Sequence, residues 1–241
     1  MYSRLPPADR RELEGLIQIF LAEKKFEGCG GQEITDEVRV LIAAQACLLL
    51  LHRDTECYPR LRSILVYPSS YLAKTRHWEP DGTISEGHQA RGGESWPHGA
   101  VVLAWDGAMA GAVEPDKGRN LVLHEFAHQL DQEDGVADGA PLLHGPGFLR
   151  TLHRYRAWAK VLSGEFQQLR RAAGEGRETV LDTYGAQNPA EFFAVATECF
   201  FEKPGRLKER HPALFAELQD FYRQDPLQYA PARPEPDEIS T

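Results

Sequence analysis

The segment that most constrains this chain is residues 120–131, which read Asn-Leu-Val-Leu-His-Glu-Phe-Ala-His-Gln-Leu-Asp. Its apolar spacing predicts an amphipathic helix, on which side chains four residues apart share one face. His124 and His128 can therefore present two imidazoles to one ion, and Glu125 can reach a water on that ion. Two histidines and a carboxylate base are the side chains needed for zinc-assisted hydrolysis.

A chance pair of core histidines is the alternative explanation of this segment. Most of its other residues are apolar, which predicts that the helix is largely buried. Buried histidine and glutamate side chains without partners would cost free energy, and a bound metal removes that cost. The apolar context therefore favours a metal site over two satisfied core residues.

A zinc hydrolase of this kind needs a third protein ligand and leaves the fourth position for water. Asn188 followed by Pro189 predicts a helix N-terminus, which puts Glu191 in the first turn of a second buried helix. A carboxylate among apolar residues is rarely left unpaired, so Glu191 is the candidate ligand. Glu198 lies on nearly the same face and is either a rival ligand or an acceptor that orients a ligand histidine. Glu202, at the end of this helix, is expected to face solvent.

Three segments of the chain together resemble one known family. They are His-Glu-Phe-Ala-His-Gln-Leu-Asp, Asp-Thr-Tyr-Gly and Asn-Pro-Ala-Glu-Phe-Phe-Ala-Val. Their combination is similar to the Mlc titration factor A (MtfA) family of zinc peptidases, and the resemblance extends over most of the chain to about Tyr222. The Tyr-Gly pair followed by Glu-Phe-Phe-Ala is also similar to the metalloprotease domain of anthrax lethal factor.

The resemblance implies a ligand set and a mechanism. By position, His124, His128 and Glu191 would bind one zinc ion per chain, and Glu125 would be the general base. A bound zinc ion would lower the pKa of its water, and Glu125 would take the proton as that water attacks a peptide carbonyl. Glu125 would then hand the proton to the leaving amine.

The resemblance also implies a role for Tyr184. This tyrosine would lie near the metal and donate a hydrogen bond to the developing oxyanion. A tyrosine in a Tyr-Gly turn can equally be a packing residue. The chain departs from the lethal factor pattern at Val195, where that pattern has a second glutamate, and this leaves the role of Glu198 open.

Two further features carry open alternatives. Asp131 follows His128 by three residues and either orients a ligand histidine or caps the helix end, and the acidic turn after it favours the structural role.

Residues 94–105 suit a strand beside which a peptide substrate can be added. Residues 100–105 predict a short strand, and Pro97 and Gly99 confine the stretch before it to an edge or a turn. An ordinary core strand explains residues 100–105 equally well.

The composition is that of an intracellular enzyme. Hydrophobic residues make up 42% and charged residues 26% of the chain, both near the averages for soluble domains. The net charge of −9 disfavours nucleic acid and anionic membrane as direct partners. No apolar run reaches membrane-spanning length, and the first residues lack an apolar signal core. We therefore expect a cytoplasmic protein.

The predicted architecture is α+β and mainly helical. The resemblance implies a zincin-like metalloprotease fold with a small sheet beside the His-Glu helix. Residues 1–60 are expected to form a helical part packed on the catalytic core, residues 61–225 the zincin-like catalytic domain, and residues 226–241 a disordered tail rich in proline and acids. Residues 204–222 predict one last helix.

The expected function is that of a cytosolic zinc metallopeptidase acting on peptides or proteins. The family resemblance implies aminopeptidase activity and binding of Mlc, a repressor of glucose-uptake genes. Glu94, Asp106 and Glu198 are candidates to bind the free amine that an aminopeptidase must recognise. One alternative is a protein-binding regulator that keeps zinc but hydrolyses little, and another is a zinc-free helical protein.

Overall fold

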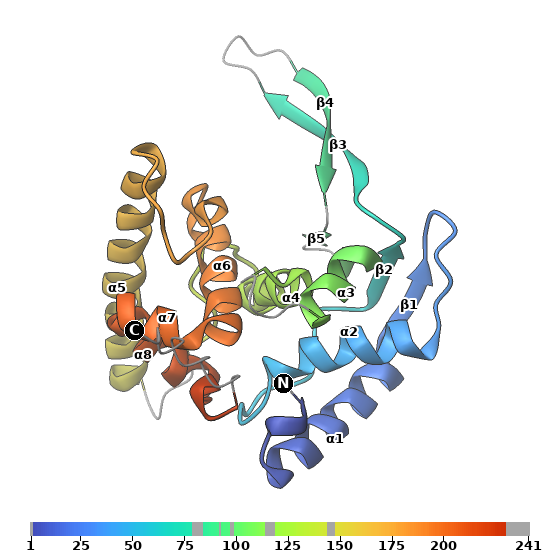
Figure 1. Ribbon diagram of the computed structural model, residues 1–241, viewed down its shortest axis with the longest axis horizontal. Helices are drawn as coiled ribbons and strands as arrows, with labels where there is room; N and C mark the ends of the chain where they lie inside the picture. The colour runs from blue at the N-terminus through green and yellow to red at the C-terminus, as the bar shows by residue number, and fades with distance from the viewer. Residues whose placement is uncertain are drawn as a thin grey trace, which may run out of the picture.

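A computed structural model describes residues 2–78, 84–91, 93–96, 99–113, 119–143 and 148–229. Within these ranges helices predominate over strands, which confirms the predicted α+β, mainly helical class (Figure 1). The helices are α1 (Pro7–Glu23), α2 (Asp36–Leu48), α3 (Trp105–Val113), α4 (Leu121–Asp131), α5 (Phe148–Gly174), α6 (Pro189–Glu202), α7 (Pro204–Arg210) and α8 (Pro212–Tyr222). Short 3-10 helices are η1 (Tyr2–Arg4), η3 (Gln132–Asp134), η4 (Thr183–Ala186) and η5 (Pro226–Gln228).

The main sheet has four described strands in the order β1-β2-β6-β5. Strands β1, β2 and β6 run parallel, and β5 pairs with β6 in the antiparallel direction. Inward-facing residues of the two middle strands, such as Val66 and Leu103, are fully buried. The strands are β1 (Lys25–Gly28), β2 (Ser63–Tyr67), β5 (Gly93–Trp96) and β6 (Ala100–Ala104).

The two strand predictions for residues 94–105 have different outcomes. Residues 100–104 form β6, which lies inside the sheet and is therefore a core strand. The edge position belongs to β5, which covers the stretch before Pro97. Because one side of β5 is not paired with a described strand, its backbone can accept an added strand.

A separate two-stranded hairpin comes between β2 and β5 in the chain. Its strands are β3 (Tyr71–Trp78) and β4 (Ile84–Arg91), paired from Tyr71 opposite Arg91 to Trp78 opposite Ile84. Figure 1 shows it extending away from the rest of the molecule.

The N-terminal helices share a core with the helix that carries the His-Glu motif. Thr35 Oγ1 accepts a hydrogen bond from Val38 N–H at 3.3 Å and so caps the start of α2. The ring of Phe20 on α1 lies 5.7 Å from that of Phe126 on α4, and Tyr58 lies 4.9 Å from Phe126. Aromatic packing of this kind connects the first part of the chain directly to α4.

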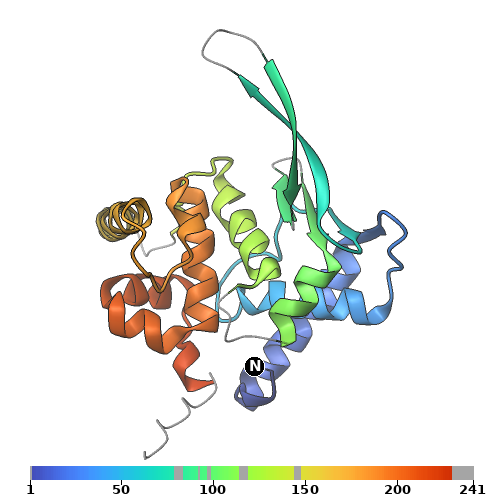
Figure 2. The same ribbon diagram turned by 45° about the horizontal axis from the view of Figure 1, so that its top comes forward.

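Helix α4 occupies the middle of the fold. It packs against α6 on one side and against β5, β6 and α3 on the other (Figure 2). The faces of α4 that meet these elements carry apolar side chains, including Val122, Phe126 and Leu130, all fully buried. Side chains on α4 and α6 can therefore meet between the two helices.

The predicted single helix over residues 204–222 is wrong. The structure has two helices, α7 and α8, separated at His211. Pro212 opens α8 and has no backbone N–H, and its ring keeps the preceding residue out of helical geometry. His211 instead makes a 2.7 Å contact between its Nδ1 and Glu165 Oε2 on α5.

The predicted disordered tail begins too early. Residues 226–228 form η5, and Tyr229 is only 4% exposed. The Tyr229 hydroxyl donates to Gln224 Oε1 at 2.9 Å. A tyrosine whose hydroxyl is hydrogen-bonded can be buried without leaving a polar group unsatisfied. The prediction of disorder is therefore wrong for residues 226–229. Residues 230–241 lie outside the described part of the chain.

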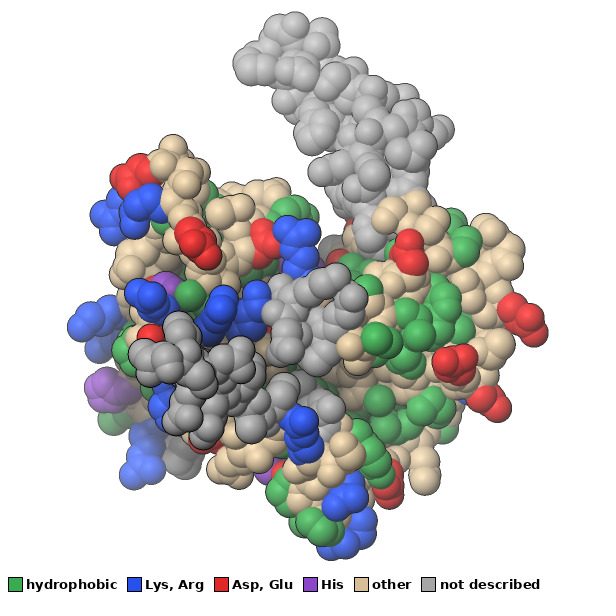
Figure 3. Space-filling model, in the orientation of Figure 1, with side chains coloured by type: hydrophobic (Ala, Val, Ile, Leu, Met, Phe, Trp, Pro, Cys, Tyr) green, Lys and Arg blue, Asp and Glu red, His purple; other side chains and the backbone are tan. Residues whose placement is uncertain are grey.

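The charged side chains are unevenly distributed over the surface. Lys and Arg side chains gather on the left of Figure 3, over the helices α5 to α8, although the chain has a net charge of −9.

Among the described residues, no helix is both long enough and apolar enough to cross a lipid bilayer.

Candidate metal centre

Asparagine caps begin both helices that carry the candidate ligands. Asn120 Oδ1 accepts from Leu123 N–H at 3.1 Å at the start of α4. Asn188 Oδ1 accepts from Glu191 N–H at 2.9 Å at the start of α6, which confirms the helix N-terminus predicted there. The second cap fixes Glu191 in the first turn of α6, next to the second turn of α4.

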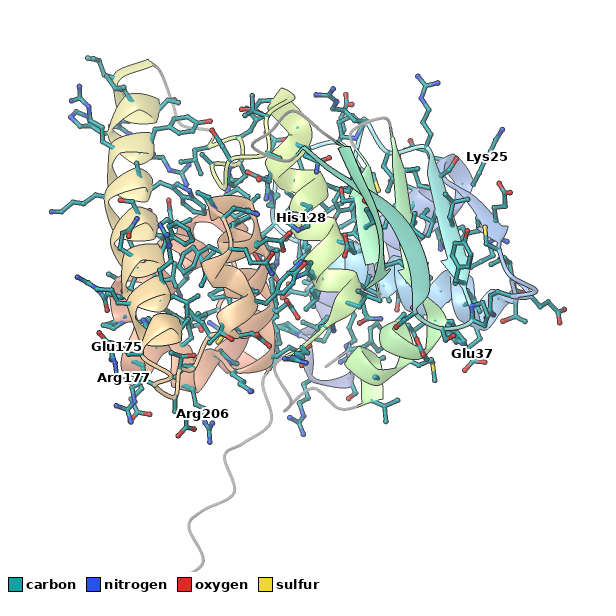
Figure 4. The ribbon with its side chains drawn as sticks, turned by 90° about the horizontal axis from the view of Figure 1, so that it is seen from above. Lys25, Glu37, His128, Glu175, Arg177 and Arg206 are labelled. Carbon is teal, nitrogen blue, oxygen red and sulfur yellow. The ribbon has the colours of Figure 1, made fainter. Side chains whose placement is uncertain are left out.

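Three ligand-type side chains converge between α4 and α6. The distance from His124 Nε2 to Glu191 Oε2 is 3.0 Å, and from His128 Nε2 to His124 Nε2 it is 3.2 Å. The third side of this triangle, from His128 Nε2 to Glu191 Oε2, is 3.4 Å. A tetrahedral zinc ion with bonds of about 2.0–2.1 Å separates its ligand atoms by roughly 3.3–3.4 Å. The triangle therefore matches one face of a zinc tetrahedron. Figure 4 shows His128 at the centre of the molecule, between the helical side and the sheet.

Hydrogen bonding at His124 explains why this arrangement suits a cation. His124 Nδ1 lies 2.7 Å from Glu198 Oε1, and because an ionised carboxylate only accepts, the Nδ1 carries the proton. In the neutral ring, Nε2 then directs a lone pair toward Glu191 Oε2, which is also an acceptor. A positive charge at this point, carried either by a proton on Nε2 or by a metal ion, makes the contact favourable.

The pKa values point to the same conclusion. Burial opposes a proton on His124, but the carboxylates of Glu191 and Glu198 outweigh burial and raise its pKa well above the ordinary value. Burial likewise raises the pKa of Glu191, yet its contacts with His124 and His128 prevail and hold that pKa at about 2. Two imidazole nitrogens and one carboxylate oxygen form a donor set typical of catalytic zinc, so these residues fit the ion.

Glu198 has both carboxylate oxygens engaged beside the ligands. Oε1 accepts from His124 Nδ1–H, and Oε2 accepts from the backbone N–H of Asn120 at 2.6 Å. A carboxylate on the far nitrogen of a ligand histidine fixes the tautomer and the orientation of the ring. These contacts favour the orienting role over that of a rival ligand.

Glu125 is buried beside the edge strand. Its side chain is only 5% exposed, and a Cβ atom placed on Gly93 would lie 2.5 Å from Glu125 Oε1. Strand β5 thus comes close to this carboxylate only because residue 93 has no side chain. Burial raises the pKa of Glu125 to about 8, with His124 opposing the shift and neighbouring carboxylates adding to it.

Tyr184 lies beside His124, in η4. Its ring centroid is 5.9 Å from that of His124, and the residue is 47% exposed. Asp182 Oδ1 accepts the Tyr184 backbone N–H at 2.9 Å, and Asp182 Oδ2 accepts from Arg119 Nε at 2.6 Å. Burial raises the pKa of Asp182, but the Tyr184 N–H and Arg119 outweigh it and lower the pKa below its usual value.

A cleft of about 890 Å³ opens over these groups. Residues of β5, α3, α4, η4 and α6 line it, and they include Glu125, Tyr184 and the three candidate ligands. Glu94 and Asp106, two of the acids predicted to bind a free amine, also line this cleft. A volume of this size admits several residues of a peptide.

Comparison with known proteins assigns the chain to a family. The sequence model described as glucose-regulated metallo-peptidase M90 matches residues 1–223. The chain belongs to this family. It is thus a member of a metallopeptidase family, and the coarse prediction of a metal-dependent peptidase is supported.

Curated relatives of this M90 family member bear the predicted family name. A protein of Klebsiella pneumoniae named Mlc titration factor A is 33% identical over 232 residues, 94% of this chain and 83% of the relative. One of the same name from Serratia proteamaculans is 32% identical, over 92% of this chain and 84% of the relative. An uncharacterized protein of Synechocystis sp. is 43% identical over 94% of this chain and 80% of its own length. The predicted resemblance to the Mlc titration factor A family is confirmed.

Two other acids near the candidate metal centre have structural contacts. Asp131 is fully buried, and its Oδ2 accepts the Gly139 backbone N–H at 3.0 Å, which supports the structural reading of this residue. The prediction that Glu202 faces solvent is wrong. Glu202 is buried, and its Oε1 accepts from Asn120 Nδ2 at 3.0 Å. The hydrogen bond between Asn120 and Glu202 thus holds the last turn of α6 against the start of α4.

The contribution of Arg119 and Asp182 to the candidate site was not predicted from the sequence. The position of Asp182 two residues before Tyr184 is a turn signal that was available in the sequence. No pattern connects Asp182 with Arg119, because the two are far apart along the chain. Their contact is visible only in the folded protein.

Replacing Glu198 with glutamine should weaken zinc binding by about 10- to 100-fold. Glutamine has one acceptor oxygen, so it cannot accept from both His124 Nδ1–H and the Asn120 N–H. Competition with a chelator dye measures the affinity. The matched control is Glu165→Gln, which changes a carboxylate that contacts His211 away from the cleft. Equal affinities for wild type and Glu198→Gln would contradict the orienting role.

Proposed function

We propose that this protein is a zinc-dependent peptidase with a zincin-like catalytic arrangement. His124, His128 and Glu191 hold the ion, and Glu125 is the general base. The observation that carries the proposal is the triangle of ligand atoms with sides of 3.0, 3.2 and 3.4 Å, at the floor of a cleft that Glu125 also lines. Membership in a metallopeptidase family supports it further.

The residues around the ion divide the chemistry between them. Zinc, when bound, supplies a Lewis acid that activates water and polarises a carbonyl group. Glu125 takes a proton from the attacking water and passes it to the nitrogen of the leaving amine. The Tyr184 hydroxyl donates a hydrogen bond to the oxygen of the carbonyl under attack. Glu198 keeps the His124 ring in the orientation that exposes Nε2 to the ion.

Peptides are the substrate class that the cleft supports best. Strand β5 is an edge strand next to Glu125, so an extended peptide can pair with its backbone as an added strand. Ser95 Oγ accepts from Gln129 Nε2 at 2.6 Å, which fixes β5 on α4. Both oxygens of Glu198 are engaged, and this leaves Glu94 and Asp106 as candidates to bind the free amine of an aminopeptidase substrate.

A regulatory role is a second candidate function, and it rests on the names of the relatives. Those proteins are called Mlc titration factor A, so binding of a repressor of the Mlc type is a reasonable proposal for this chain. The cytosol, where such a repressor acts, is the location that we propose. A pure binding role predicts repressor binding that is unchanged when the peptidase chemistry is removed.

The test of the proposed function is mass spectrometry of a peptide mixture incubated with the full-length protein. We expect cleavage by the zinc-loaded protein, loss of cleavage after dialysis against a chelator, and recovery when zinc is restored. The positions of the cuts separate trimming from the N-terminus from internal cleavage. If the zinc-loaded protein holds one ion and cleaves nothing, the peptidase proposal fails and the binding role takes its place.

A further inference from the structure

Packing alone does not hold Tyr184 beside the metal centre. Nearly half of this residue is exposed, and its ring meets that of His124 at a tilted angle of 59°. A group that stabilises a developing charge must be held in place before the reaction, because small displacements remove much of its effect. The backbone turn that carries Tyr184 is therefore one determinant of the position of its hydroxyl.

Asp182 organises that turn. Its Oδ1 accepts the Tyr184 N–H at 2.9 Å, and its main-chain oxygen accepts the Gly185 N–H at 3.1 Å. On the other side, a Cβ atom added to Gly185 would lie 3.2 Å from Val195 on α6 and from Leu169 on α5. The turn is thus pressed against two helices and held from Asp182.

Arg119 connects Asp182 to the start of α4. Its Nε donates to Asp182 Oδ2 at 2.6 Å, while 78% of the arginine side chain is exposed. The next residue is Asn120, which caps α4 and donates its backbone N–H to Glu198. One end of this chain of contacts is the Tyr184 turn, and the other is the helix that carries His124.

We propose that Asp182 and Arg119 are positioning residues for Tyr184, because together they tie its turn to the N-terminus of the metal-binding helix. This inference rests on the proposed function, in which Tyr184 donates to the reacting carbonyl. An exposed ion pair adds little to overall stability, so variants that break it should fold and load zinc normally. Its contribution lies in the geometry of the site.

Two variants break the tie at different atoms. Arg119→Gln removes the guanidinium. Asp182→Asn keeps an oxygen for the Tyr184 N–H and turns an amide N–H toward Arg119. For both we expect kcat to fall by about tenfold, with KM and zinc content unchanged. Arg177→Gln is the matched control, because Arg177 Nε makes a similar exposed contact of 2.5 Å with Glu175 Oε2, outside the cleft. That control should leave kcat unchanged.

Combining these substitutions with Tyr184→Phe shows whether the contact between Arg119 and Asp182 acts through the Tyr184 hydroxyl. Tyr184→Phe alone should lower kcat by about a hundredfold. Adding Arg119→Gln or Asp182→Asn to it should lower kcat no further. If Arg119→Gln instead raises KM in both backgrounds and leaves kcat alone, Arg119 contacts the substrate and the positioning proposal is wrong.

Hydrogen exchange provides a readout that does not depend on turnover. The backbone amides of residues 184–187 should exchange several-fold faster in Arg119→Gln than in wild type, with Arg177→Gln unchanged. Unchanged exchange and unchanged kcat in Arg119→Gln overturn the proposal. If wild type cleaves no peptide, the proposed function fails by itself, and the exchange rates still decide whether the tie holds the turn.

Discussion

Glu125→Gln should reduce the rate of peptide hydrolysis by about a thousandfold while one zinc ion stays bound. Glutamine keeps the shape of the side chain in the space left by Gly93, and it does not replace any of the three metal ligands. It cannot take a proton from water or deliver one to the leaving amine. Steady-state kinetics and metal analysis of the same sample measure the two parts of this prediction.

Glu133→Gln is the matched control for this variant. Glu133 is a partly buried acid on η3, only eight positions further along the chain, and it does not line the cleft. Burial raises its pKa, as it does for Glu125, so the control removes a comparable carboxyl group. The control should keep the wild-type rate. Hydrolysis by Glu125→Gln at the rate of the control would exclude Glu125 as the general base.

Gly139→Ala should lower the free energy of unfolding by about 3 kcal/mol or more. Gly139 has a φ of +78°, and an added Cβ would lie 2.5 Å from the backbone oxygen of Pro189. Its N–H is bound by Asp131, and its carbonyl oxygen accepts from Trp158 Nε1 at 2.9 Å. With contacts to α4, α5 and the start of α6, the loop cannot move away without breaking hydrogen bonds.

Gly176→Ala separates backbone strain from the steric contact. Gly176 also has a positive φ, of +65°, but an added Cβ would meet nothing within 4 Å. The free energy of unfolding of this variant should fall only by the cost of the left-handed backbone conformation, about 1 kcal/mol. Urea unfolding of both variants, compared at constant m-value, gives the difference. Equal losses at the two positions would show that the contact with Pro189 has no energetic consequence.

The parts of the fold predicted from sequence are those that depend on local patterns. The cap at Asn188, the helical spacing of His124 and His128, and the short apolar run that forms β6 are properties of short segments. Each has a direct physical cause in hydrogen bonding or in the burial of apolar side chains. Those causes act within a few residues, so one sequence is enough to recognise them.

The parts that could not be predicted depend on contacts between distant segments. The helix at residues 105–113 contains Gly107 and Gly111, which disfavour helix formation, so its local sequence does not indicate it. In the structure α3 packs closely on the start of α4, and a Cβ on Gly111 would lie 2.9 Å from Asn120 Cγ. The burial of Glu202 has the same origin, since its partner Asn120 belongs to another helix.

The role of Glu198 shows the same limit within the candidate site. Its position on the face of Glu191 left two readings open, a ligand and an acceptor for a ligand histidine. Only the folded structure reveals that both of its oxygens are occupied, by His124 Nδ1–H and by the Asn120 N–H. Spacing along a helix predicts which face a side chain shares, and the partner on that face comes from tertiary packing.

The most direct test of the metal centre is anomalous diffraction at the zinc edge, from crystals of the zinc-loaded protein. The expected result is one strong peak within about 2.0–2.2 Å of His124 Nε2, His128 Nε2 and a Glu191 carboxylate oxygen. Glu125 should lie next to the peak without binding it. A peak at another site, or none between α4 and α6, would contradict the metal centre and the peptidase mechanism built on it.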